Sequence, residues 1–97
     1  MKNYIRDLKQ RCVSKLEKTS ARIQDTIPHT TTNGKYNDFS DVERVACWTN
    51  SFWAGIMWRM YCETSEKKYA EYAESIDNKI EKVLYEFYLT DHDLGFL

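Results

Sequence analysis

The sequence has 97 residues, a length that fits one domain and leaves no room for a second independent core. Aromatic residues make up 14% of the chain, which is not typical of disordered segments. The formal net charge is −1, with basic and acidic residues spread along the chain, so neither nucleic acid nor a membrane is expected as a partner.

The first residues carry a cation followed by charges of alternating sign, not the unbroken apolar run of a secretory signal, and no apolar run approaches the ~20 residues of a membrane-spanning helix. We therefore expect a cytoplasmic protein. Cys12, Cys47 and Cys62 are widely spaced and form no CxxC pair. This spacing indicates free, buried thiols and favours neither a disulfide framework nor a zinc site. No metal and no cofactor is expected.

The first predicted element is an amphipathic helix over about residues 3–25. Its apolar positions recur at helical spacings of three, four or seven residues: Ile5, Leu8, Cys12, Leu16 and Ile23. Pro28 ends it. Residues 28–47 are rich in Thr, Asn, Asp and Gly and include the turn dipeptide Asn33-Gly34. We expect a long irregular loop there, and loops of this length often line binding sites.

A second helix is predicted over 50–63 and a third over 66–88. Three residues that favour helix N-caps, Thr49-Asn50-Ser51, precede the second helix, which is apolar nearly all round and therefore indicates burial on more than one side. The third helix carries one apolar face and one charged face, and the charged face is interpreted as solvated surface. The chain is thus predicted to be all-α, a single unit over 1–97 with about three helices.

Two clusters could carry chemistry. Trp48 and Trp53 lie beside polar Thr49 and Asn50, as an aromatic platform for a sugar ring would, although such tryptophans are more often core or rim residues. His92 lies between two carboxylates, an arrangement that fits either helix capping or a carboxylate that acts on a substrate. No third or fourth ligand at a suitable spacing favours a metal site.

The order of these clusters resembles glycoside hydrolase family 88, the unsaturated glucuronyl hydrolases. The resemblance rests on the helix start Trp48-Thr49-Asn50-Ser51-Phe52-Trp53, on Tyr69-Ala70-Glu71-Tyr72-Ala73, and above all on His92-Asp93-Leu94-Gly95-Phe96. It extends upstream to Ile27-Pro28-His29 and Lys35-Tyr36 and so covers nearly the whole chain. Asp91 stands where the family usually has a second His, and Thr49-Asn50-Ser51 stands where Thr-Asp-Gly is common.

The resemblance implies a partial (α/α)6 six-hairpin barrel in which the second helix is an inner helix and the third an outer one. It also implies that Trp48 contacts the sugar ring, that His92 binds the unsaturated uronate and that Asp93 is one of two active-site aspartates. The substrate would be an oligosaccharide that ends in a 4,5-unsaturated uronic acid, derived from glycosaminoglycan or pectin. The family's reaction hydrates the enol ether and does not displace the sugar at its anomeric carbon.

The proton-donating aspartate of the family lies beyond His92-Asp93-Leu94-Gly95-Phe96, so we expect these 97 residues to be an amino-terminal segment that is inactive alone. An inner helix without its neighbours is also expected to self-associate through its exposed apolar side chains. Two alternatives stay open. One is a segment of an unsaturated rhamnogalacturonyl hydrolase, and the other is a non-catalytic helical interaction protein.

Overall fold

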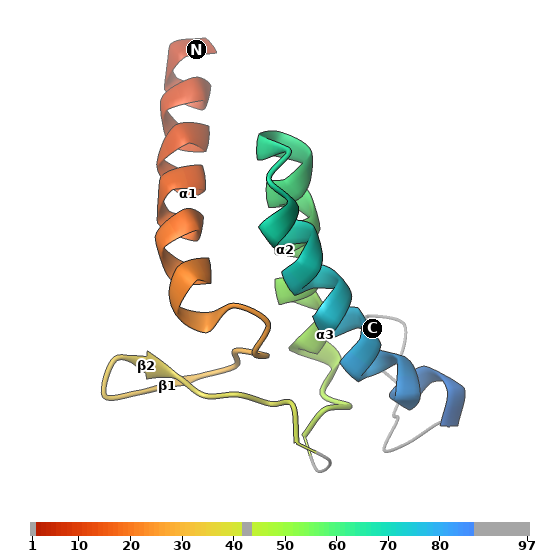
Figure 1. Ribbon diagram of the computed structural model, residues 1–97. Coiled ribbons are helices and arrows are strands. Elements are labelled where there is room, and N and C mark those ends of the chain that lie inside the picture. Colours follow the sequence, from red (N-terminus) through yellow and green to blue (C-terminus); the bar gives the residue numbers. More distant parts are fainter. Residues whose placement is uncertain (1, 42–43, 87–97) are drawn as a thin grey trace.

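The computed structural model describes residues 2–41 and 44–86. Three helices dominate it: α1 (Lys2–Ile23), α2 (Ser51–Thr64) and α3 (Lys67–Glu86) (Figure 1). Strands β1 (Thr31–Thr32) and β2 (Lys35–Tyr36) and the 3-10 turn η1 (Trp48–Asn50) lie between α1 and α2. The prediction of a mostly helical chain is confirmed, and the predicted helix boundaries agree to within about two residues wherever the structure describes them.

The segment after α1 is not wholly irregular, and on this point the prediction was wrong. Strands β1 and β2 form an antiparallel hairpin in which Thr31 pairs with Tyr36 and Thr32 with Lys35. Its two-residue loop consists of Asn33 (φ 53°) and Gly34 (φ 77°). Two consecutive positive φ angles match the twist of a tight hairpin, and Asn-Gly is the dipeptide that reaches them at least cost. The predicted turn therefore extends into a hairpin.

Asparagine and aspartate side chains hold the base of this hairpin. The Asn37 carboxamide oxygen accepts hydrogen bonds from the backbone N–H groups of His29 (3.1 Å) and Thr30 (2.9 Å). The Asp38 carboxylate accepts one from the N–H of Ile27 (2.9 Å), whose side chain is fully buried. Burial acts to raise the pKa of Asp38, but the hydrogen bonds from Ile27 and Ser40 outweigh it and bring this pKa below its ordinary value.

The core lies between α2 and α3, which run antiparallel as a helical hairpin (Figure 1). Ser65, the residue directly after α2, has the left-handed conformation (φ 60°) common at helix ends, and its N–H donates to the Tyr61 carbonyl (2.8 Å). Side chains at three- and four-residue spacings are buried on the facing sides: Trp53, Ala54, Met57 and Met60 from α2, and Tyr69, Ala73, Ile76, Ile80 and Val83 from α3. The predicted apolar face of the third helix is confirmed.

Only one side of α2 is buried. Phe52, Ile56, Trp58 and Tyr61 stay between 37% and 51% exposed, while Met57 is fully buried. The prediction that this helix is buried on more than one side is therefore not met within the described residues. Helices α1 and α3 together cover only the side that carries Met57. Partly exposed apolar side chains therefore lie on both edges of the buried side of α2.

Helix α1 joins this core through its carboxyl-terminal half. Leu16 and Ile23 pack against the core, whereas Ile5 (60% exposed) and Leu8 (46% exposed) do not. In Figure 1 the amino-terminal end of α1 stands clear of the helical hairpin. All three cysteines are free thiols, but their expected burial is wrong: Cys12 and Cys62 are exposed, and Cys47 is half-buried. Cys12 is exposed because the face of α1 on which it lies is uncovered there.

Met57 tests whether the α2–α3 seam carries the stability of the chain. Met57 has no exposed surface, so Met57→Ala should lower the free energy of unfolding by about 2–5 kcal/mol. The control Tyr85→Ala removes a side chain that is 77% exposed and should change it by less than about 0.5 kcal/mol. Urea unfolding followed by circular dichroism measures both. Equal effects of the two substitutions would contradict this location of the core.

Candidate functional site

The candidate site is an aromatic corner, defined as Trp48 and Phe52, at the point where α2 begins. Trp48 belongs to η1 and is 40% exposed, and Phe52 in the first turn of α2 is 51% exposed. Their rings meet edge to face, with centroids 6.0 Å apart and planes at 82°. Edge-to-face packing orients the two rings relative to each other. The corner therefore presents two partly exposed rings in a fixed mutual orientation, and the sugar-binding role of Trp48 stays a prediction.

A buried amide holds the backbone beneath this corner. Asn50 is 1% exposed, and its Nδ2 donates to the carbonyl oxygens of Arg44 (3.0 Å) and Val45 (2.7 Å). Asn50 occupies the N-cap position of α2, but its side chain makes no capping hydrogen bond. Its carboxamide oxygen has no hydrogen-bond partner among the described residues. Asn50 was predicted only as one of three capping residues, and its side chain instead bonds carbonyls five and six residues earlier in the chain.

A stack of three side chains braces the segment that leads to η1. The Phe39 ring lies parallel to the His29 imidazole, with centroids 4.3 Å apart, and the Arg44 guanidinium lies 4.7 Å from the Phe39 centroid. Arg44 also donates from Nε to the Asp41 carboxylate (2.6 Å). The loop was predicted as a candidate lining of a binding site. In the structure, this part of the loop supports the backbone that carries Trp48, while residues 33–36 help to line a separate cavity of about 580 Å³.

The other two tryptophans differ from Trp48. Trp53 is 7% exposed, and its indole N–H donates to the Gln24 carbonyl (3.0 Å), which ties α2 to the turn after α1. Trp53 is therefore a core residue and not a sugar platform. Trp58 is 38% exposed, and its indole N–H donates to the Asp77 carboxylate on α3 (2.9 Å). Of these two tryptophans, Trp58 is the one whose exposure matches that of Trp48.

His92 and Asp93 lie outside the described residues, so their distance from Trp48 stays a prediction. The structure does describe the end of α3, which precedes both residues in the sequence. Because α2 and α3 are antiparallel, α3 ends at Glu86 on the same side of the hairpin where α2 begins (Figure 1). The chain therefore leaves the described part of α3 on the side that carries the aromatic corner.

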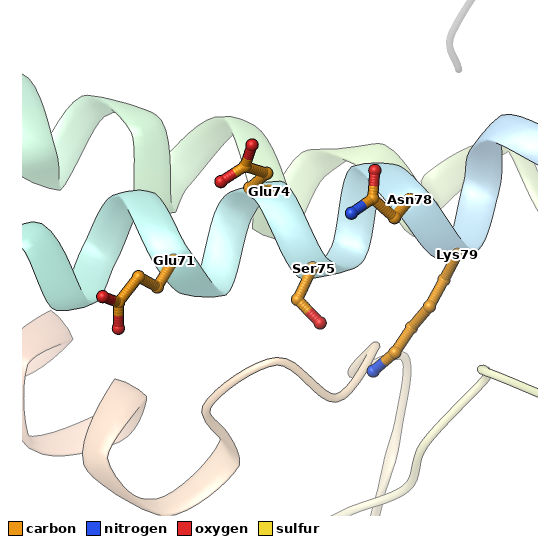
Figure 2. Close-up of a pocket in the computed structure, with 5 residues that line it drawn as sticks. All are labelled: Glu71, Glu74, Ser75, Asn78 and Lys79. Atoms are coloured by element: carbon orange, nitrogen blue, oxygen red, sulfur yellow. The ribbon is translucent and has the colours of Figure 1, made fainter.

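A separate hollow of about 510 Å³ lies on α3 beside the turn after α1 (Figure 2). The Ser75 hydroxyl donates to the Asp25 carboxylate (2.6 Å), and the Lys79 ammonium donates to the Asp25 carbonyl (2.7 Å). In Figure 2, Ser75 and Lys79 both point toward that turn. These polar groups tether α3 to the end of α1. The interpretation of the α3 charges as only a solvated face was wrong for Lys79, because its partner lies 54 residues away in sequence.

Two further properties of the described residues concern metal binding and membrane spanning. Within 2–41 and 44–86, no three His, Cys, Asp or Glu side chains lie close enough together to bind a metal ion. Over the same ranges, no helix combines the length and the apolar character that crossing a membrane requires.

The tether to Asp25 predicts a pH dependence of stability. The hydrogen bond from Ser75, reinforced by Lys79, lowers the pKa of Asp25 below its ordinary value. A carboxylate whose pKa is lower in the folded state stabilises the fold above its unfolded pKa of about 4 and loses that contribution as the pH falls through the folded pKa. Stability should therefore fall below about pH 4. Asp25→Asn should flatten this fall, whereas Asp7→Asn, on the exposed part of α1, should not. Urea unfolding between about pH 2.5 and 7 measures it, and identical slopes for both variants would contradict the tether.

Asn50 gives a second prediction, because aspartate has nearly the same shape but lacks the amide donor. An aspartate has no donor for the carbonyls of Arg44 and Val45 and would bury a charge. Asn50→Asp should lower the free energy of unfolding by about 3 kcal/mol or more, and Asn50→Ala by about 1–3 kcal/mol. The same chemical change at an exposed position, Asn78→Asp, should have little effect. If Asn50→Asp is as stable as the unsubstituted chain, the bracing role is wrong.

Comparison of the chain with protein-family models, with curated proteins and with solved structures gives no significant match. The functional proposal therefore rests on the residues and the geometry of the chain itself.

Proposed function

We propose that the chain is the amino-terminal segment of an unsaturated glucuronyl hydrolase. Such an enzyme removes 4,5-unsaturated uronic acid from the ends of lyase-cut oligosaccharides by hydrating the enol ether. The main supporting observation is the exposed aromatic corner of Trp48 and Phe52 at the end of an antiparallel helix pair. The motif His92-Asp93-Leu94-Gly95-Phe96 follows α3 in the sequence.

Trp48 is proposed to stack on the sugar ring. A pyranose presents C–H groups on its faces, and these pack against the face of an aromatic ring, while its hydroxyl groups point outward to polar partners. The Phe52 ring supports the indole from the side, with centroids 6.0 Å apart. The cross-bracing of Asn50 keeps the backbone under Trp48 in place, which a platform needs if it is to orient its substrate.

His92 and Asp93 are proposed to act on the unsaturated uronate. In this reaction an aspartic acid protonates the C4=C5 double bond, water adds at C5, and the hemiketal that results opens and releases the sugar. The acid must stay protonated near neutral pH, and a second carboxylate nearby raises its pKa in the required direction. Asp93 is proposed as that second carboxylate, and the proton donor as a residue beyond Leu97.

The surfaces of α2 and α3 support a place in an (α/α)6 barrel. An inner helix must contact helices on several sides, and α2 still exposes Phe52, Ile56 and Tyr61 after α1 and α3 have packed against it. An outer helix needs one apolar and one polar side, and α3 buries Ile76 and Val83 while Glu71, Glu74 and Lys82 are exposed. We propose α2 as an inner helix and α3 as the outer helix that follows it.

A cytoplasmic location belongs to the proposal, because three free thiols suit a reducing compartment. The exposed side of α2 also supports a second candidate function, a helical interaction protein that binds a partner or a second copy through this side. The two functions differ in what extension of the polypeptide beyond Leu97 does: it creates activity in a hydrolase and leaves an interaction protein inactive.

The proposal predicts no hydrolase activity for residues 1–97 and activity for a longer polypeptide that includes the proton donor. The conjugated C4=C5 uronate absorbs at ~232 nm, and loss of this absorbance reports turnover because protonation of the double bond removes the conjugation. Unsaturated chondroitin or hyaluronan disaccharides and unsaturated rhamnogalacturonan disaccharides should be compared as substrates. Preference for the last would assign the related rhamnogalacturonyl activity. Sustained turnover by residues 1–97 would contradict the segment assignment.

In the longer polypeptide, Trp48→Ala should lower kcat/KM roughly tenfold or more by removing the stacking surface. Trp58→Ala is the matched control, since Trp58 is 38% exposed against 40% for Trp48. Asp93→Asn should lower kcat much more strongly and leave the fold intact. Equal effects of the two tryptophan substitutions would contradict the role of Trp48, and normal turnover of Asp93→Asn would contradict the role of Asp93.

A further inference from the structure

The apolar stripe of α1 continues past the point where its packing stops. Ile5, Leu8, Cys12 and Leu16 follow one another at spacings of three and four, which places them along one side of the helix. Leu16 packs against the core, but Ile5 is 60% and Leu8 46% exposed. From Ile5 to Leu16 the stripe is ~17 Å long at 1.5 Å per residue. About three turns of apolar helix surface are therefore left uncovered or only partly covered.

Beside this stripe lies a groove of about 260 Å³ between α1 and α2. Its apolar lining consists of Cys12, Val13, Leu16, Ile56 and Met60. Ile56 is 37% exposed, so part of this lining is accessible from outside. Two helices that diverge above an apolar floor form a channel into which the ridge of a third helix packs. The shape and polarity of the groove thus fit the apolar side of an α-helix.

The rim of the groove carries an excess of positive charge. The Glu63 carboxylate is shared by Lys9 (2.6 Å) and Arg59 (2.8 Å), so two cations face one anion. The hydrogen bond from Lys9, together with Arg59, lowers the pKa of Glu63, which keeps this carboxylate charged. From Lys2 to Lys15, α1 contains five basic residues and one acidic residue. An occupant of the groove is favoured when it brings negative charge to both rims.

We propose that this groove binds an amphipathic α-helix whose apolar stripe is flanked by acidic residues, supplied by polypeptide outside residues 1–97. The proposal does not depend on the hydrolase activity. A second copy of α1 fits the groove poorly, because it would bring the same basic residues against the same basic rim. A flat anionic bilayer is less suitable than a helix because the apolar side chains of the groove lie in a concavity between two helices.

Two thiols of the chain itself provide the measurement. Cys12 and Cys62 are both exposed, but only Cys12 lines the groove. The probe is a synthetic helical peptide of about 18 residues with leucines at helical spacing and glutamates on both flanks. A matched peptide carries lysines in place of the glutamates. Alkylation of each cysteine is followed by mass spectrometry, with Cys62 as the internal control.

The glutamate peptide should slow alkylation of Cys12 at least tenfold at saturation and leave Cys62 unchanged, while the lysine peptide should protect neither. Ile56→Asp should weaken binding of the glutamate peptide at least tenfold, and Tyr85→Asp, at a position that is 77% exposed on α3, should not. Lys9→Glu reverses the charge at one rim without touching the apolar lining. It should shift the preference toward the lysine peptide, which separates loss of charge matching from loss of folding.

Three results would overturn the proposal. The first is the absence of Cys12 protection by the glutamate peptide, or equal protection by both peptides. The second is protection of Cys12 that rises with protein concentration in the absence of peptide, which would identify a second copy as the occupant. The third is protection only by vesicles of phosphatidylcholine with about one third phosphatidylserine, which would identify an anionic lipid surface as the ligand.

Discussion

Burial of Met57 and Ile76 in the seam between α2 and α3 is the contact on which the other described elements depend. Neither helix could bury its apolar side alone. The turn after α1 is bound through the Trp53 indole N–H and through Ser75 and Lys79. The hairpin segment contributes fully buried Ile27. These contacts are all made to α2 or α3. Separation of the two helices at their seam would therefore release α1 and the support of Trp48 together.

Helix α2 carries apolar side chains both on its buried side and on its exposed surface. Met57 and Met60 face the seam, while Phe52 and Ile56 face outward on the side that leads to the aromatic corner. An exposed apolar surface is costly for an isolated chain unless something covers it. In the proposed barrel, other inner helices and the sugar would cover this side. Under the proposed function, the partly exposed apolar side chains of α2 are therefore the ones that the complete enzyme would cover or use.

The net charge of −1 conceals a strong separation of charge along the chain. Helix α1 contains seven basic and two acidic residues, and the rest of the chain is acidic enough to balance it. Averaged over 97 residues, this charge gave no reason to expect an ionic partner. On the folded chain, the basic residues of α1 flank an uncovered apolar stripe, and charge at one place governs association more than the total does.

Sequence alone determined the features that follow from local periodicity and local turn chemistry. These are the three helices, the end of α1 before Pro28 and the turn at Asn33-Gly34, because each depends on residues within a few positions of one another. Sequence alone also singled out Trp48 as a candidate platform, a role that stays a proposal. Tertiary structure decided which tryptophan is core, since Trp53 differs from Trp48 only in what the fold places beside it: the Gln24 carbonyl, 29 residues away. It likewise decided the pairing of Lys79 with Asp25 and the exposure of Cys12, because each depends on contacts, or on a missing cover, between segments far apart in the chain.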